Sequence, residues 1–514
     1  RHTMENTDKL TIRQAEVCKL LVDENNNING VVTYSGAIYH CKCVVLATGT
    51  YLKARCIYGD VSNETGPNGL QSATHLTDSL KELGIEMFRF KTGTPARVDK
   101  RSIDFSKMQE QKGDERVVPF SFTTDPESVQ KDQVSCWLTY TNEQTHEIIR
   151  SNLDRSPLYS GVIHGTGPRY CPSIEDKVVR FADKDHHQVF IEPEGLYTNE
   201  MYLGGMSSSM PEDVQYEMYH TVAGLENVKI VRNAYAIEYD CINPRQLKPT
   251  LEFKKIGGLY SAGQFNGSSG YEEAAAQGII AGINAALHVL KRQELVLDRS
   301  QAYIGVLIDD LVTKENHEPY RMMTSRAEYR LLLRQDNADL RLTAIGHEIG
   351  LISDERYQKL NDKKQQIDEE IKRLQTTTIG TTPQVQAFLE QHNSTLLKSG
   401  MTLEELLKRP EICYNDLKEI DTKRPELPEA VTQQVEISIK YEGYIKRQLQ
   451  QVEQFKKLEK KKLSLDFDYS QVPNLRKEAI QKLNEYQPAS IGQASRISGV
   501  SPADVSVLLV YLNR

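Results

Sequence analysis

The sequence predicts an α/β fold in which a dinucleotide-binding domain is interrupted by an inserted α+β domain and followed by an all-helical domain. Two apolar strands, Val44–Ala47 and Gly258–Ala262, each run into glycine, as strands of a parallel sheet do at a ligand-binding edge. From Ser300 onward nearly every segment has helical periodicity. The 514 residues suffice for roughly two to four domains. The expected boundaries are 1–90, 91–249, 250–300 and 301–514, where the first and third ranges form one domain.

Composition indicates a globular chain, because apolar residues make up 39% and charged residues 26% of it. The longest apolar run, Ile279–Leu290, is interrupted by Asn284 and is shorter than the roughly 18 residues of a membrane span. The net charge of −8 argues against a surface devoted entirely to nucleic acid. We therefore expect no membrane segment and only local basic surfaces.

The eight cysteines are too sparse for a disulfide scaffold and include no CxxC pair. Cys41 and Cys43 stand in a predicted strand, where alternate side chains point the same way, so two core-facing thiols are favoured over a metal clip. We expect a reducing, cytoplasmic compartment and no metal site. The chain shows no signal peptide and enters strand-like sequence directly from Arg1, which suggests a start partway through a fold.

The N-terminal elements are predicted to form an antiparallel meander. Its strands are Leu10–Asp23, Val31–Tyr34 and Ala37–Ala47, joined by turns rich in Asn and Gly. The last strand is apolar on both faces, which predicts burial on both faces as in a parallel sheet. An amphipathic helix over His75–Leu83 should end at Gly84.

The later elements differ in character. The irregular stretch 91–249, with many Pro and Gly and the only Trp, predicts the inserted domain. An Ala-rich helix is expected over Tyr271–Leu290, and the charge-rich Tyr357–Gln375 reads as a solvated helix. Ser490–Leu512 should form two short helices, superficially like a helix-turn-helix.

The segment Gly257–Ala286 indicates flavin binding. Its strand, glycine-rich loop and helix would aim the first, unpartnered helix amides at a ligand, where they favour the negative charge of a reduced flavin. Gly278 and Gly282, four residues apart, would let this helix lie close to the sheet. A generic strand–turn–helix packing unit is the alternative.

Val44–Tyr51 (VVLATGTY) strengthens the flavin hypothesis, because two-dinucleotide-binding (Rossmann-like) flavoproteins use such a strand where the chain returns to the FAD domain. The G-x-G-x-x-G loop that opens these folds is absent, since Gly165-Thr166-Gly167 continues to Tyr170 outside any βαβ unit. We expect that on the order of a hundred N-terminal residues carrying this unit are missing from the chain.

Cys171 is a candidate nucleophile. If Pro172 takes the first position of a helix, Cys171 is its N-cap, and a helix N-terminus lowers the pKa of a thiol. Arg169 is a nearby cation that acts in the same direction. A buried, inert cysteine is the alternative.

The chain resembles the glucose-inhibited division protein A (MnmG/GidA) family, the large subunits of bacterial enzymes that modify tRNA uridine. The most specific motifs are GPRYCPSIEDKVVRF (167–181) and AGQFNGSSGYEEAAAQGIIAGINA (262–285). The resemblance extends over essentially the whole chain, through Arg89–Phe105, Arg150–Ile163, Pro319–Thr343, Gln434–Ile445 and Ala489–Pro502. The family's pyrophosphate loop and a second functional cysteine near it have no counterpart.

The resemblance implies an enzyme that binds FAD and NAD(H). Such an enzyme adds a carboxymethylaminomethyl or aminomethyl group to carbon 5 of the wobble uridine (position 34), with methylene-tetrahydrofolate as carbon donor and NADH as reductant. The amine comes from glycine or ammonium. The resemblance also implies a homodimer that forms a heterotetramer with two copies of a GTPase subunit.

The resemblance assigns site residues as well. Cys171 would add to carbon 6 of uracil and so activate carbon 5, although the absent cysteine remains an alternative nucleophile. The expected FAD contacts are Val17, Gly49, Ser72, Gly263, Gln264 and Gly270. The expected NAD contacts are Gly167, Pro168, Arg169, Tyr170, Cys171, Pro172, Ser173, Ile174, Glu175, Asp176, Lys177, Val178, Val179, Arg180 and Phe181.

Basic segments are candidates for tRNA contact. Arg326, Arg330 and Arg334 recur every four residues on a predicted helix face, with surface ion pairs as an equal alternative. Lys440–Lys462 carries net +5 and Arg89–Arg101 net +4. Phosphate contact is favoured over a merely solvated face in a tRNA-modifying family. The lysines expected to contact tRNA are Lys456, Lys457, Lys460, Lys461 and Lys462. Ser490–Leu512 is expected to dock the GTPase.

Two other functions remain open. The folate-dependent tRNA uridine methyltransferases have a similar FAD domain but lack the long helical extension that begins near residue 350. A non-catalytic RNA-binding scaffold with a flavoprotein fold is the second alternative.

Overall fold

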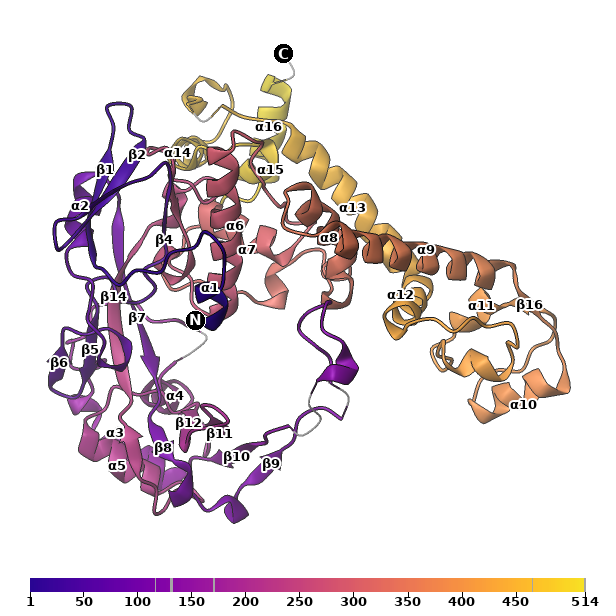
Figure 1. The fold of residues 1–514 in the computed structure, drawn as a ribbon, viewed down its shortest axis with the longest axis horizontal. Coiled ribbons are helices and arrows are strands. Elements are labelled where there is room, and N and C mark those ends of the chain that lie inside the picture. Colours follow the sequence, from indigo (N-terminus) through magenta and orange to yellow (C-terminus); the bar gives the residue numbers. More distant parts are fainter. Residues whose placement is uncertain (116, 130–132, 170–171, 465, 513–514) are drawn as a thin grey trace. The chain divides into compact units, whose positions relative to one another are not determined.

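The computed structural model describes residues 1–115, 117–129, 133–169, 172–464 and 466–512 (Figure 1). The chain divides into two compact units. Unit 1 comprises Arg1–Val296 and Asp310–Met322, and unit 2 comprises Leu297–Asp309 and Met323–Arg514.

Unit 1 begins with the short helix α1 (His2–Glu5) and a three-stranded antiparallel sheet of β1 (Val17–Val22), β2 (Ile28–Thr33) and β3 (Ile38–His40). The predicted meander is therefore present, but its first strand starts at Val17 rather than Leu10. Helix α2 (Leu76–Glu82) lies on β1, where the Leu20 amide donates to Ser79 Oγ at 3.1 Å. Gly84, at φ +74°, follows the helix as predicted.

Strand β4 (Val44–Leu46) is separate from β3 and pairs in parallel with β15 (Leu259–Ser261). The single predicted strand Ala37–Ala47 is wrong, because Cys41 and Cys43 lie between the two strands. Both thiols are half-buried and unpaired. The prediction that β4 is buried on both faces is also wrong, because Val45 in the middle of β4 is 38% exposed. Among the described residues, β15 is the only strand beside β4.

Helix α6 (Tyr271–Val289) follows β15 as predicted. Its buried face carries Gln277, Ile280, Ala281 and Asn284. The proposed role of Gly278 and Gly282 in close packing is wrong, because a Cβ at either position would meet no described atom within 4 Å.

The middle of unit 1 contains two further sheets. The first has the order β6 (Val61–Asn63), β5 (Arg55–Tyr58), β14 (Tyr235–Ile242) and β7 (Met87–Thr94), and β7 pairs with β14 along its full length. The second is antiparallel, in the order β13 (Ile230–Arg232), β8 (Arg97–Asp99), β12 (Glu200–Gly204), β11 (Gln188–Pro193), β10 (Cys136–Tyr140) and β9 (Gln109–Gln111).

Three helices contribute to the core of the antiparallel sheet. They are α3 (Glu143–Ser151), α4 (Ile174–Arg180) and α5 (Glu212–His220). Buried side chains from strands and helices, including Ile149, Ile174, Leu203 and Met218, form one hydrophobic cluster. Chain segments that fold against each other in this way form an α+β arrangement.

Unit 2 is helical apart from the short pair β16 (Thr378–Ile379) and β17 (Met401–Thr402), so the all-helical prediction needs this one correction (Figure 1). Two hydrophobic clusters stabilise it, one around Leu406 and Val435 and one around Leu483 and Leu508. Helix α7 (Tyr303–Thr313) has residues in both units. The helices of unit 2 that follow are α8 (Ala338–Glu348), α9 (Asp354–Thr376), α10 (Pro383–Gln391), α11 (Leu403–Leu407), α12 (Glu429–Lys440), α13 (Glu442–Lys460), α14 (Lys477–Tyr486), α15 (Ile491–Ala494) and α16 (Pro502–Leu512).

The remaining regular structure is a set of single 3-10 turns. They are η1 (Pro67–Gly69), η2 (Lys100–Ser102), η3 (Phe105–Lys107), η4 (Pro126–Ser128), η5 (Leu153–Arg155), η6 (Pro244–Gln246), η7 (Gly263–Asn266), η8 (Thr324–Arg326), η9 (Gln335–Asn337), η10 (Asp416–Glu419) and η11 (Tyr469–Gln471). Across the described ranges, none of the helices combines the length and the apolar character that a bilayer crossing requires.

We predict that Gly258→Ala destabilises unit 1 more than Gly36→Ala does. Both glycines have positive φ, but a Cβ at Gly258 would also lie 2.7 Å from the Lys42 carbonyl oxygen, whereas one at Gly36 meets nothing within 4 Å. Strain alone costs about 1 kcal/mol, and the added clash should raise the cost at Gly258 to about 3 kcal/mol. Melting temperatures from circular dichroism measure the difference, and equal shifts would contradict the steric argument.

Candidate functional site

The carboxyl edge of the parallel pair β4–β15 gathers several predicted FAD contacts. The Ala262 amide donates to the Leu46 carbonyl oxygen at 2.8 Å, so the residues that follow each strand emerge side by side. Gly49, at φ +56°, follows β4, and Gly263, at φ +81°, follows β15. Only glycine adopts these conformations at little cost, and ligands of open α/β sheets bind at such an edge.

Val17 and Ser72 connect to the same edge through neighbouring residues. The Ser72 hydroxyl donates to the carbonyl oxygen of Tyr51, two residues after Gly49, at 3.2 Å. Glu16, which precedes Val17, accepts from the Thr74 amide at 3.1 Å. The structure therefore brings Val17, Gly49 and Ser72 into one neighbourhood.

The N-terminus of α6 adds Gln264 and Gly270. Gly270 is the N-cap, at φ +121°, and no side chain caps the helix. Gln264 Nε2 donates to the Tyr239 hydroxyl at 3.1 Å. Two buried oxygens near the carboxyl edge, Thr48 Oγ1 and Glu273 Oε2, have no hydrogen-bond partner among the described residues.

These observations fit a flavin. Helix α6 has 19 residues and no side chain that caps its N-terminus, so its first backbone amides are available as N–H donors. Buried polar atoms without partners are rare unless a ligand or water satisfies them. The other oxygen of Glu273 accepts from the Met322 amide at 2.8 Å, which holds its carboxylate in place.

A buried carboxylate, Glu238 of β14, organises the chain that leads into the 167–181 segment. The side chain is 0% exposed and accepts from the amides of His164 and Gly165, each at 2.6 Å. Arg55 Nη2 donates to its second oxygen at 2.7 Å, and Arg89 Nε lies 3.6 Å away.

Burial alone would raise the pKa of Glu238. The amide of Gly165, the guanidinium of Arg55, the amide of His164 and the charge of Arg89 outweigh it, so the pKa lies below its usual value of 4.5. The carboxylate is therefore ionised at neutral pH and holds residues 164 and 165 in place.

The segment 167–181 contains helix α4, which starts at Ile174. Its N-cap is Ser173, whose Oγ accepts from the Asp176 amide at 3.4 Å. The prediction that Pro172 opens the helix is therefore wrong, and Ser173 takes the capping role assigned to Cys171. Tyr170 and Cys171 themselves lie outside the described residues.

Much of α4 serves packing. Ile174, Glu175 and Val178 are buried, and Glu175 Oε1 accepts from both the amide and the hydroxyl of Ser209 at 3.0 Å. Lys177 Nζ donates to the Gly205 carbonyl oxygen at 3.0 Å. The side chains of Val179 and Phe181 are exposed instead.

Close packing against β7 explains why residue 165 is a glycine. A Cβ at Gly165 would lie 2.8 Å from the Phe90 carbonyl carbon, where residue 166 pairs with β7. The Gly165-Thr166-Gly167 sequence is therefore explained by close backbone approach rather than by a phosphate-binding loop.

Three of the five basic residues in the run Arg89–Arg101 form ion pairs, so its net charge overstates the positive charge that it presents. Arg89 pairs with Asp240 at 2.8 Å, Arg97 with Glu194, and Arg101 with Asp99 at 2.6 Å. The acids that neutralise Arg89 and Arg97 stand far away in the sequence, which is why counting charges in one window missed them.

Arg326, Arg330 and Arg334 do not share a helix face, so that prediction is wrong. Residues 324–326 form η8, and the Leu332 and Leu333 amides both donate to the Tyr329 carbonyl oxygen in turns. Arg334 pairs with Asp336 at 3.1 Å. Nearby Glu328 pairs with the buried Arg299 at 2.8 Å, so this region is largely an ion-pair network. Arg330 is exposed.

The predicted tRNA-binding lysines lie together at the C-terminal end of α13. Lys457, Lys460 and Lys462 are exposed, while Lys456 and Lys461 are half-buried. No ion pair joins the three exposed lysines to an acid within the part of the chain that the structure describes. A helix C-terminus also favours such cations, which is a structural reason for their presence.

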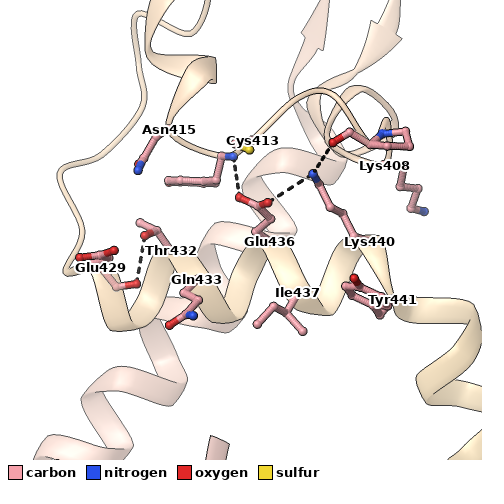
Figure 2. A pocket seen from close by; sticks show the side chains of 12 residues that line it. Lys408, Cys413, Asn415, Glu429, Thr432, Gln433, Glu436, Ile437, Lys440 and Tyr441 are labelled. Atoms are coloured by element: carbon pink, nitrogen blue, oxygen red, sulfur yellow. Dashed lines mark hydrogen bonds and ion pairs between the residues drawn. The ribbon is translucent and has the colours of Figure 1, made fainter. Parts of the chain in front are cut away.

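A cavity of about 650 Å³ in unit 2 lies between α12 and the segment 408–415 (Figure 2). Glu436 accepts from the Tyr414 amide at 2.8 Å and pairs with Lys440 at 3.2 Å. Partial desolvation and the nearby Glu436 raise the pKa of the Cys413 thiol, so this cysteine is not an activated nucleophile. No sequence pattern indicated this cavity.

Comparisons with known proteins agree with this architecture. Family models match glucose inhibited division protein A over residues 1–293, and the C-terminal helical domain and helical bundle of the tRNA modifying enzyme MnmG/GidA over residues 354–449 and 451–514.

Individual proteins are similar along the whole chain. The chain is 70% identical to the tRNA uridine 5-carboxymethylaminomethyl modification enzyme MnmG of Lachnoclostridium phytofermentans, covering 100% of this chain and 82% of the relative. Identity to the MnmG enzyme of Caldicellulosiruptor saccharolyticus is 64% over the same shares. The crystal structure of Aquifex aeolicus GidA superposes with a TM-score of 0.90 at 44% identity, covering 100% of this chain and 82% of that one.

We predict that Glu238→Gln lowers the stability of unit 1 by about 2 kcal/mol at pH 7, because it removes the buried negative charge that accepts from Arg55 and from two backbone amides. The depressed pKa means that the stabilisation is present above the unfolded-state pKa and is lost as pH falls through the folded-state pKa. The gap in melting temperature between wild type and variant should therefore narrow toward pH 4.

Glu143→Gln serves as the control, because Glu143 forms an exposed ion pair with Arg150 at 2.7 Å. It should change the melting temperature little. A gap for Glu238→Gln that stays constant with pH would contradict the charge-based explanation.

Proposed function

The chain belongs to the MnmG/GidA family of tRNA-modifying enzymes, and we propose that it is the FAD-dependent subunit that modifies carbon 5 of the wobble uridine (position 34). The group added is carboxymethylaminomethyl or aminomethyl. Methylene-tetrahydrofolate is the carbon donor and NADH the reductant. The single observation that carries the proposal is the match of both the sheet region and the helical region to this family.

The carboxyl edge of β4–β15 is the proposed FAD site. Gly49, Gly263 and Gly270 leave room for close approach, while Gln264 and the amides at the start of α6 supply donors. FAD, when bound, supplies the redox chemistry that processes the folate-derived carbon. The free helix amides favour negative charge at this position.

Cys171 is the proposed nucleophile. Carbon 5 of uracil reacts poorly until a group adds at carbon 6, and a thiolate can make this addition, which leaves an enolate that attacks an electrophilic methylene. Elimination of the thiolate after proton loss from carbon 5 restores the uracil ring. The role of Glu238 is to hold residues 164 and 165, and thereby the chain that leads to the proposed NAD segment.

The helical unit distinguishes this proposal from its rivals. The folate-dependent methyltransferases lack the extension that the family models match over residues 354–449 and 451–514. We propose that this unit binds tRNA and a GTPase subunit, in a heterotetramer with two copies of each in the cytoplasm. The lysines at the end of α13 are the proposed phosphate contacts.

We predict that Cys171→Ser abolishes wobble modification in cells while the purified protein keeps its flavin absorbance near about 450 nm. Mass spectrometry of tRNA nucleosides measures the modification. Cys413→Ser is the matched control, because the pKa of that thiol is raised, and it should leave modification unchanged. Unchanged modification with Cys171→Ser would exclude this nucleophile, and a wild-type protein without flavin after addition of FAD would favour the scaffold alternative.

We predict that replacing Lys457, Lys460 and Lys462 together with Gln weakens tRNA binding and flattens its salt dependence. Each phosphate contact contributes about one unit to the slope of log affinity against log salt, so the slope should fall by about two to three. Filter binding at several salt concentrations measures it.

The control replaces three exposed lysines elsewhere in unit 2, Lys359, Lys398 and Lys418, with Gln. It removes the same charge, so a similar loss of slope in the control would mean that only net charge matters. An unchanged slope in the α13 variant would show that its lysines form a solvated face.

A further inference from the structure

A network of four buried polar side chains connects the loop 263–270 to the elements on either side of it. The four are Ser261 at the end of β15, Asn266 in η7, Ser268 in the loop and Gln277 of α6, and each is 0% exposed. None of them is among the FAD contacts that the resemblance implies. Burying an uncharged polar group is costly unless hydrogen bonds compensate for the lost water, so the partners of these side chains indicate their role.

The side-chain amide of Asn266 joins β15 to α6. Its Nδ2 donates to the Ser261 carbonyl oxygen at 3.0 Å and to Gln277 Oε1 at 2.8 Å. Its Oδ1 accepts from the Ser261 hydroxyl. Both N–H groups and the oxygen of this amide are therefore occupied, which fixes the orientation of the side chain.

The side-chain amide of Gln277 extends the network to the loop. Its Nε2 donates to Ser268 Oγ at 2.8 Å and to the carbonyl oxygen of Glu273, one turn earlier in α6, at 3.1 Å. The Ser268 hydroxyl in turn donates to the Gly263 carbonyl oxygen at 3.0 Å. Gln277 thus holds the backbone at both ends of the loop, directly at Glu273 and through Ser268 at Gly263.

The loop needs such support, because three of its residues are glycines at positive φ. The φ angles are +81° at Gly263, +72° at Gly267 and +121° at Gly270. Glycine has more accessible backbone conformations than any other residue, so a glycine-rich loop adopts one of them only when its surroundings select it. A buried network whose donors are all occupied is rigid enough to make this selection.

We propose that Gln277 is a positioning residue for the flavin. Through Asn266 and Ser268 it fixes the backbone of residues 263–270, and with it the direction of the N–H groups that favour the reduced, negatively charged flavin. The inference rests on the proposed function, which assigns FAD to this loop. Donors stabilise a developing charge best when they are already oriented, so loss of the network should disfavour the reduced flavin more than the oxidised flavin.

The experiment compares Gln277→Met with wild type in the full protein loaded with FAD. Methionine has a similar unbranched side chain but cannot replace the hydrogen bonds of the amide. Slow reduction in the presence of a reference dye measures the ratio of reduced to oxidised flavin at a given potential. Gln277→Met should lower this ratio about tenfold, which corresponds to about 30 mV for a two-electron couple.

Asn284→Leu is the matched control, because Asn284 is a second buried amide on the same helix. It is 0% exposed, and its Nδ2 donates to the carbonyl oxygens of Thr250 at 3.2 Å and Leu295 at 2.9 Å. Its loss should lower the melting temperature of the protein without FAD about as much as Gln277→Met does, since both leave buried backbone oxygens without donors. The flavin ratio should stay at the wild-type value, because these partners lie outside the loop 263–270.

Ser268→Ala is a second variant, which removes only the hydroxyl that links Gln277 to the Gly263 carbonyl oxygen. It should lower the flavin ratio in the same direction, by about threefold. This variant decides the question if Gln277→Met does not fold.

A wild-type flavin ratio in Gln277→Met would overturn the inference, and so would a wild-type ratio in Ser268→Ala if only that variant folds. An equal shift in Asn284→Leu would also overturn it, because general loosening of α6 would then explain the effect. A lower melting temperature without a change in the ratio would mean that the network only stabilises the fold.

Failure of the inference can be told apart from failure of the proposed function. Wild-type protein that takes up FAD, while Gln277→Met and Ser268→Ala keep its flavin ratio, rejects only the positioning role. Wild-type protein that takes up no FAD rejects the flavin site and this inference with it.

Discussion

The structure of unit 1 depends on the donors that compensate the burial of one carboxylate, that of Glu238. It sits on strand β14, between β5 and β7, and accepts hydrogen bonds from Arg55 of β5 and from the backbone amides of residues 164 and 165, while Arg89 of β7 lies 3.6 Å away. A carboxylate in this position is tolerable only when its lone pairs are occupied. The same requirement fixes three separate parts of the chain relative to each other within the unit. Hydrogen bonds from residues 164 and 165 to this carboxylate hold the chain just before the 167–181 segment.

Patterns of local periodicity predicted the fold well, because they reflect which face of an element is buried. Helices α2 and α6 appear near their expected ends, and β4 and β15 pair in parallel as two strands ending in glycine suggested. The errors came where tertiary contacts override local pattern. Gly278 and Gly282 were assigned to the packed face of α6, but the buried face is set by Gln277, Ile280 and Ala281. Spacing alone does not say which stripe of an almost uniformly small, apolar helix faces the sheet.

The glycines of the candidate site could be predicted from the sequence, whereas its buried charged residue could not. The positive φ angles of Gly49, Gly263 and Gly270 agree with residues chosen from glycine-rich sequence beside buried strands. Glu238 could not be chosen from the sequence, because an acid in an apolar strand looks the same whether or not the fold gives it partners. The sequence predicted Cys171 as the N-cap of α4, but the N-cap is Ser173. A serine hydroxyl is among the preferred acceptors for the free amides at a helix N-terminus. Net charge counted in a sequence window overstates free positive charge for a related reason, because Arg89 and Arg97 meet acids at positions 240 and 194 that only the fold brings near.

The parallel pairing of β4 with β15 has a consequence for how the protein is made. More than two hundred residues separate Leu46 from Leu259, so β4 leaves the ribosome long before its partner exists. At about 5–20 residues per second, the interval is roughly 10–40 s. Throughout that time the apolar strand Val44–Leu46 presents an unpaired edge, which is a template for wrong association. Assembly of the carboxyl edge of β4–β15 is therefore a late event in synthesis, and the nascent chain needs protection until residue 261 has emerged.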